Sequence, residues 1–165
     1  MIIKEIRIQG NLRAEDDGIR IRLKARQGEP FKSAVVRDDV KSIYAMGFFD
    51  DVKADLSSDG ILTYIVKERP YIKEVSIQGN SKVSNEKIEA ALGIKPRTIL
   101  DKDKVSMGVK NVRKLYSDQG YESAKVDFAI AEEINNQALV ILEIREGKRL
   151  LIQKISFEGN HVFSD

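Results

Sequence analysis

The sequence has no cysteine and a single histidine, His161, among its 165 residues. The absence of cysteine excludes disulfides, thiolate zinc sites and a cysteine nucleophile. One histidine without cysteine cannot assemble a usual zinc site or a Ser-His-Asp triad, so we expect His161 at the surface. These absences predict a protein that is not an enzyme and that uses no metal and no cofactor.

The sequence also lacks a long apolar run and an excess of one charge. No apolar stretch approaches the roughly 18 residues of a membrane-spanning helix, and Met1 is not followed by a signal peptide. The 28 basic and 26 acidic side chains are spread evenly and give a net charge of +2, whereas nucleic-acid binding demands a one-sided basic excess. We expect no nucleic-acid partner, and we interpret the chain as an excised fragment whose export signal or membrane part lies outside it.

What the sequence does contain is a repeat. The segment 3–11 (IKEIRIQGN) returns as 72–80 (IKEVSIQGN) and, more loosely, as 152–160 (IQKISFEGN). In each copy apolar and polar residues alternate, which predicts a strand with one buried face, and the Gly-Asn pair ends that strand. Copies roughly 70 to 80 residues apart indicate an array of like modules. We therefore predict one module over residues 1–69, a second over 70–147, and the first strand of a third within 148–165.

Two helices are expected after the opening strand of each module. In the second module the first helix lies within 84–93, where Ser84 is a cap and Gly93 a stop. In the first module the corresponding stretch, 12–28, alternates apolar and basic residues and resembles a strand when taken alone. We assign it to a helix as well, because Ile19 and Leu23 align with Ile88 and Leu92 of the second module.

The second helix of each module carries an apolar stripe at helical spacing. We expect Ser33 to cap the first of these helices and Asp101 to cap the second. Gly47 and Gly120 end them. The stripes are Val36, Val40, Ile43 and Tyr44 in the first module and Val105, Val109, Val112 and Tyr116 in the second.

A hairpin closes each module. Its strands are expected at about 52–56 and 62–67 in the first module, joined by a turn with the Asp59-Gly60 signal, and at about 124–131 and 138–144 in the second. The predicted fold class is therefore α+β. Each module has the order β-α-α-β-β and forms a three-stranded mixed sheet with two helices on one face.

Five short motifs accompany this order, and they are Gly47-Phe48-Phe49-Asp50-Asp51-Val52, Glu68-Arg69-Pro70, Gly79-Asn80, Gly120-Tyr121, and Ala124 with Val126. Together with the element order they resemble the POTRA (polypeptide-transport-associated) domain of the Omp85 family, over essentially the whole chain. Asp16-Asp17-Gly18, a poor helix interior, departs from that pattern and puts the length of the first helix in question.

The resemblance implies a function, a compartment and a set of partners. It implies the periplasmic part of an outer-membrane protein of a Gram-negative bacterium, which contacts the membrane only through a C-terminal β-barrel absent from this chain. It also implies that the modules hold unfolded outer-membrane proteins and dock accessory lipoproteins. The expected mode of client binding is strand addition to an exposed sheet edge.

The resemblance places those edges on the first hairpin strand of each module. The expected binding residues are Val52, Lys53, Ala54, Asp55 and Leu56 in the first module and Lys125, Val126, Asp127, Phe128 and Ala129 in the second. Their Lys and Asp side chains are equally consistent with protection of an open edge against aggregation. The module joints are expected at Arg69 and Pro70, where proline stiffens the chain, and at Gly147, which leaves more freedom.

Two other interpretations share part of this pattern. Another Omp85-type protein, a two-partner secretion or translocation-and-assembly factor, carries similar modules. A KH-like RNA-binding module also combines a small sheet with paired helices, but it needs a G-x-x-G loop, and no two glycines here fall three apart.

Several side-chain groups invite a functional interpretation, and for each the structural one is favoured. We expect the neighbouring acids to be solvated rather than catalytic. The aromatics at the start of the hairpins should pack in the core or at an interface rather than stack on a ligand. The basic residues of 20–26 should form a solvent-exposed helix face rather than bind anionic lipid or nucleic acid. These groups are Asp16-Asp17, Asp38-Asp39, Asp50-Asp51 and Glu132-Glu133; Phe48, Phe49 and Tyr121; and Arg20, Arg22, Lys24 and Arg26.

Overall fold

A computed structural model describes residues 1–151 of the chain. The expected strand of a third module and His161 lie outside these residues. The chain forms two compact units. The first comprises Met1–Lys73, Arg97–Asp101 and Glu132–Ala138, and the second comprises Glu74–Pro96, Lys102–Ala131 and Leu139–Asp165, of which the structure describes the part up to residue 151.

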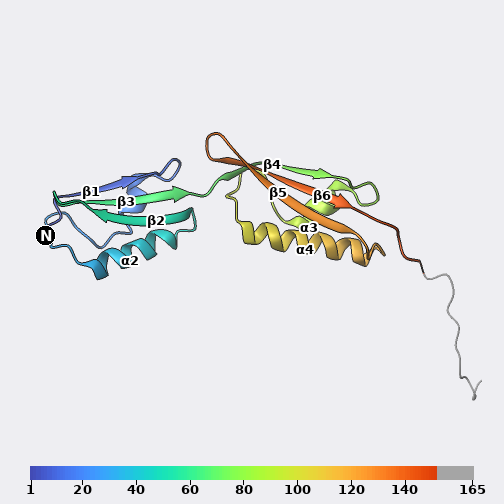
Figure 1. Ribbon diagram of the computed structural model, residues 1–165, viewed down its shortest axis with the longest axis horizontal. Coiled ribbons are helices and arrows are strands. Elements are labelled where there is room, and N and C mark those ends of the chain that lie inside the picture. The colour runs from blue at the N-terminus through green and yellow to red at the C-terminus, as the bar shows by residue number, and fades with distance from the viewer. Residues whose placement is uncertain (152–165) are drawn as a thin grey trace, which may run out of the picture. The chain divides into compact units, whose positions relative to one another are not determined.

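The first sheet has three strands and is built from residues 1–69 (Figure 1). Its elements are β1 (Glu5–Gln9), α1 (Asp16–Arg20), α2 (Ser33–Tyr44), β2 (Phe49–Leu56) and β3 (Ile61–Glu68). The strand order is β1-β3-β2, with β1 parallel and β2 antiparallel to β3. The β2–β3 turn fits its sequence, because Gly60 takes a positive φ of 85° there.

The second sheet repeats this arrangement (Figure 1). Its elements are β4 (Tyr71–Gln78), α3 (Asn85–Leu92), α4 (Lys102–Asp118), β5 (Lys125–Glu133) and β6 (Gln137–Arg145). The strand order is β4-β6-β5, and α3 packs on α4. The predicted α+β class and the β-α-α-β-β order are confirmed.

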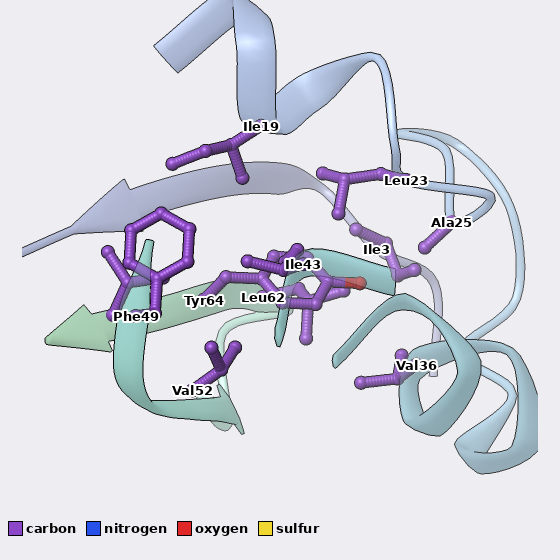
Figure 2. Packing of buried hydrophobic residues seen from close by; sticks show 11 residues of the cluster. Ile3, Ile19, Leu23, Ala25, Val36, Ile43, Phe49, Val52, Leu62 and Tyr64 are labelled. Atoms are coloured by element: carbon purple, nitrogen blue, oxygen red, sulfur yellow. The ribbon is translucent and has the colours of Figure 1, made fainter. Parts of the chain in front are cut away.

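The core of the first unit lies between its sheet and its helices. Figure 2 shows Ile19 of α1, Val36 of α2, and Phe49, Val52 and Leu62 of β2 and β3 pointing into one space. In the second module the stripe of α4 is buried as predicted. Helices of this amphipathic kind are held in place mainly by that buried face rather than by helix propensity.

The first helix of the first module is the main departure from the sequence prediction. It spans only Asp16–Arg20, and the chain then continues without helix past Ile21, which is 81% exposed. Ile19 and Leu23 are nevertheless buried, as Ile88 and Leu92 are in the second module. The alignment of core positions was therefore correct, and the helix length was wrong.

One pair of equivalent positions differs in a way that matches this difference in helix length. Asp39 of α2 is fully buried, and its carboxylate accepts hydrogen bonds from the backbone N–H groups of Lys24 (2.6 Å) and Ala25 (3.0 Å). The equivalent residue of α4 is Gly108, where a Cβ would collide with the Leu92 carbonyl of α3. In the first module a carboxylate satisfies the amides of a non-helical segment, whereas in the second a glycine lets a regular helix approach closely.

Three smaller predictions also need correction. Ser33 is the first residue of α2 rather than its cap, because the cap position is Lys32 and no side chain bonds there. Tyr44 lies outside the buried stripe and is 49% exposed. Asp39, expected to be solvated, is buried because two amides and the Tyr64 hydroxyl satisfy it.

The repeated Gly-Asn motif has a structural explanation in both modules. Gly10 and Gly79 take positive φ values of 91° and 86°, and a Cβ at either position would collide with a backbone carbonyl of the adjacent strand, that of Val66 or Ile144. Only glycine allows the chain to turn this close to its neighbour.

An acidic residue then holds the loop that follows each of these turns. The Glu68 carboxylate accepts hydrogen bonds from three consecutive backbone amides, of Leu12, Arg13 and Ala14. Glu146 accepts hydrogen bonds from the amides of Ser81 and Lys82 in the second module. The end of the last strand is thereby fastened to the loop after the first strand.

Candidate peptide-binding edges

The first candidate edge, β2, lies at one side of its sheet and pairs with β3 through Val52↔Val66, Ala54↔Tyr64 and Leu56↔Leu62. Val52 is buried, and Ala54 and Leu56 pack against the core. Lys53 and Asp55 alternate with them and are exposed. The strand is therefore anchored by one set of side chains while its outer backbone side has no neighbouring strand among the described residues.

The β2 edge begins with an irregularity. The register with β3 shifts between Phe49 and Asp51, so that Asp50 is an extra residue in the strand. The guanidinium of Arg69 lies beside it, with Nε 3.5 Å from the Asp50 carboxylate. Phe49 is fully buried and meets the ring of Phe48 edge to face, whereas Phe48 is 42% exposed. The predicted core role therefore holds for Phe49 and only in part for Phe48.

The second candidate edge, β5, occupies the corresponding place beside β6. Val126 is buried, while Lys125, Asp127 and Ala129 are exposed. Phe128 is 38% exposed although its position in the alternation places it on the same face as Val126. Beyond Val126 this edge therefore presents more apolar surface than β2 does.

Arg113 of α4 is a functional candidate that the sequence did not reveal. Its Nε and one terminal nitrogen donate to the backbone carbonyl of Val126 at 3.1 Å and 2.6 Å. The same terminal nitrogen lies 3.9 Å from the Asp127 carboxylate. In α2 the equivalent residue is Tyr44. An arginine beside Val112, within the span of a helical stripe, gives no sequence signal that it will reach a strand.

The three predicted joint residues have defined surroundings within their own units. The Arg69 N–H donates to the Phe48 carbonyl at 2.8 Å, and the Pro70 carbonyl accepts a hydrogen bond from the Leu100 N–H at 2.8 Å. Gly147 takes a positive φ of 69°, and a Cβ there would collide with the Ser123 hydroxyl. Glycine is thus required at residue 147 by its backbone conformation as well as by space.

The electrostatics of the second module centre on Glu146. Burial opposes ionisation of this carboxyl, but the Ser81 and Lys82 amides and the hydroxyls of Tyr116 and Ser81 outweigh burial and lower its pKa to about 2. Burial and the same hydrogen bond raise the pKa of Tyr116. Glu146 is therefore a structural carboxylate that stays ionised at neutral pH.

The expected solvent-exposed helix face over residues 20–26 is wrong, because α1 ends at Arg20 and the other basic residues of this stretch lie outside the helix. Arg20 donates to the Ile6 carbonyl, Arg26 to the Leu23 and Ala25 carbonyls, and Lys24 lies 3.7 Å from Asp38. Within residues 1–151, no cluster of three or more histidine, cysteine or acidic side chains is placed to bind a metal ion. None of the helices in that part of the chain has the length and apolar content needed to cross a membrane.

Comparison with known proteins gives a consistent result. The family model for POTRA, surface antigen variable number repeat, matches residues 1–69 and 70–147. The chain is 30% identical over 161 residues to the outer membrane protein assembly factor BamA of Nitratidesulfovibrio vulgaris, covering 95% of this chain and 20% of the relative. It is also 30% identical over 166 residues to BamA of Neisseria meningitidis, covering 99% and 21%. The chain thus spans about one fifth of the length of these relatives.

The fold is also found in solved structures. The N-terminal domain of Omp85 from Thermosynechococcus elongatus superposes with a TM-score of 0.56 at 23% identity, covering 89% of this chain and 63% of that one. The resemblance inferred from the motifs is confirmed by these matches.

Proposed function

The chain belongs to the POTRA family, and from this membership we propose that it is the periplasmic POTRA region of an outer-membrane protein assembly factor of the BamA type. In this role residues 1–69 and 70–147 act as modules that bind unfolded outer-membrane proteins and dock accessory lipoproteins. The support for this role is the similarity to proteins named as assembly factors, together with the geometry of the two sheets.

The proposal depends most on one observation: each sheet has its hairpin strand, β2 or β5, at an edge. An edge strand presents backbone N–H and C=O groups that a further strand can pair with. A client held by its backbone can have almost any sequence, which suits a protein that receives many different unfolded chains. The alternating exposed Lys53 and Asp55 keep such an edge from pairing with another copy of itself.

The experiment is a chemical-shift titration of the isotope-labelled chain with an extended strand peptide from an outer-membrane protein. We expect amide shifts to cluster on residues 52–56, on 125–129, or on both. The matched control is the same peptide with alternate backbone amides N-methylated, which keeps the side chains but cannot form a ladder. Single-stranded RNA is the second control.

Two results would overturn the proposal. Equal binding of the methylated peptide would show that side chains rather than strand pairing hold the client. A response to RNA on the basic residues of 20–26, with both edges silent toward the peptide, would favour a nucleic-acid partner instead.

A further inference from the structure

The two candidate edges differ at one backbone carbonyl. On β5 the Val126 carbonyl accepts two N–H groups of the Arg113 guanidinium, at 3.1 Å and 2.6 Å. A carbonyl oxygen has two lone pairs. Because two N–H groups of Arg113 already occupy this acceptor, we take the Val126 carbonyl to be one that faces the open side of β5 rather than one that pairs with β6.

One acidic side chain lies beside the arginine. The Asp127 carboxylate lies 3.9 Å from the terminal nitrogen that also bonds Val126. The planar fork of a guanidinium loses little freedom when it makes two bonds at once, and a charged donor makes the bonds stronger than a neutral one would. An incoming strand has to displace this cap before it can pair with residues 125–129.

The first module has no such cap. The apolar stripes of α2 and α4 align at Val40 and Val109, which places Tyr44 where the second module has Arg113. Tyr44 is half exposed, and within residues 1–151 its hydroxyl makes no hydrogen bond. A phenol also has a single donor and no charge, so it could not saturate a carbonyl in the same way.

We infer that Arg113 closes the β5 edge, so that an extended peptide adds first to β2 and reaches β5 only when the arginine is displaced. The inference rests on the proposed function, because it assumes that strand addition is how clients bind. It assigns different roles to the two modules. The β2 edge binds an extended peptide directly, whereas the β5 edge binds one only after Arg113 has moved away, which makes Arg113 the specificity-determining residue of that edge.

The test compares peptide titrations of the unaltered chain with those of two variants. Arg113→Tyr introduces the residue found at the equivalent position of the first module. Arg113→Gln removes the guanidinium whose two nitrogens donate to the Val126 carbonyl. Lys114→Tyr is the control, since Lys114 lies next along α4 and pairs with Asp118 away from the strand. The amides of 52–56 and of 125–129 are followed separately in each titration, with one strand peptide as the probe.

In the unaltered chain we expect 52–56 to respond at lower peptide concentration than 125–129. Removing Arg113 should lower the half-saturation concentration at 125–129 about tenfold, the effect of one charge-assisted hydrogen-bond cap, and leave 52–56 unchanged. Lys114→Tyr should change neither edge.

The outcomes separate this inference from the proposed function. If 52–56 responds but 125–129 is unaffected by either Arg113 variant, the inference is wrong and strand addition stands. If 52–56 stays silent while 125–129 responds once Arg113 is removed, the cap is supported and the role of β2 is wrong. Silence of both edges in every variant, or an equal effect of Lys114→Tyr, overturns the inference.

Discussion

The Tyr64 hydroxyl donates a 2.7 Å hydrogen bond to the Asp39 carboxylate, and neither residue is exposed to solvent. Burial, followed by this hydrogen bond, raises the pKa of Tyr64 well above its usual value. The pair joins the middle of α2 to the central strand β3, while the same carboxylate holds the backbone after α1. In the second module the equivalent residues are Gly108, which lies close to Leu92 of α3, and Leu142, which is buried, so neither can form this polar link.

The first prediction concerns this pair. Asp39→Ala should destabilise the first module by about 3 kcal/mol, because it leaves two buried amides and a hydroxyl without an acceptor. Tyr64→Phe should cost only about 1 kcal/mol, since Asp39 keeps its two amides. Urea unfolding followed by amide signals of the first module measures both. Asp38→Ala, at an exposed neighbour, is the control and should stay within about 0.5 kcal/mol; equal losses at 38 and 39 would contradict the assignment.

The second prediction concerns pH. The pKa of Glu146 is lowered from 4.5 to about 2 in the folded state, so the stability it contributes is complete above pH 4.5 and is lost as pH falls toward 2. The second module should therefore lose stability over this interval. Glu146→Gln should be less stable at neutral pH and lack most of this acid dependence. Acid titration of the Ser81 and Lys82 amide shifts follows the group directly, and a midpoint near 4.5 would refute the lowered pKa.

The third prediction concerns the repeated Gly-Asn turn. Gly10→Ala and Gly79→Ala should each destabilise their module by about 3 kcal/mol or more, because a Cβ collides with a strand carbonyl and the backbone has a positive φ. Gly18 has an ordinary φ and nothing within 4 Å of its Cβ position. Gly18→Ala should therefore stabilise α1 slightly, by about 0.5 kcal/mol. Thermal unfolding measures the stability of all three variants. A similar loss of stability in each would show that the collision and the positive φ are not the cause.

The fourth prediction compares two serines at helix starts. Ser84 accepts a hydrogen bond from the Lys87 amide and caps α3, whereas Ser33 is already inside α2 and caps nothing. Ser84→Ala should cost about 1 kcal/mol, and Ser33→Ala should be neutral or slightly favourable because alanine is the better helix former. Helical circular dichroism during chemical unfolding measures both. A larger loss at Ser33 would mean that the helix start is misplaced.

Much of the fold was predictable because the chain repeats itself. Ser84 and Gly93 identified α3 by its ends, and the alignment of Ile19 with Ile88 located buried residues where local signals were contradictory. The full length of α1 was not predictable from its own residues. The first module has the Asp39 carboxylate at the position where the second module has Gly108, and only the first of these bonds the backbone after α1. Asp16-Asp17-Gly18 gave a local warning about this length, but the contact of Asp39 with the backbone of Lys24 and Ala25 joins residues distant in sequence and leaves no local pattern.

The candidate edges were predictable in part. The hairpin turns located β2 and β5, and the order of the strands then places both at sheet edges. Arg113 was not predictable, because the reach of a long side chain to Val126 depends on how α4 lies against β5. Whether the edges accept a client remains a prediction for both strands.

The parallel pairing of β1 with β3 also decides how a module carries load. The chain enters at the start of β1 and leaves at the end of β3, and these two strands are neighbours with Glu5 opposite Ile61 and Gln9 opposite Ile65. Tension between the two ends therefore pulls the strands past each other and loads the whole ladder at once, instead of peeling its hydrogen bonds apart singly. A module of this design resists stretching along the chain. The outer hairpin strand β2 does not lie between the two strands that bear the tension.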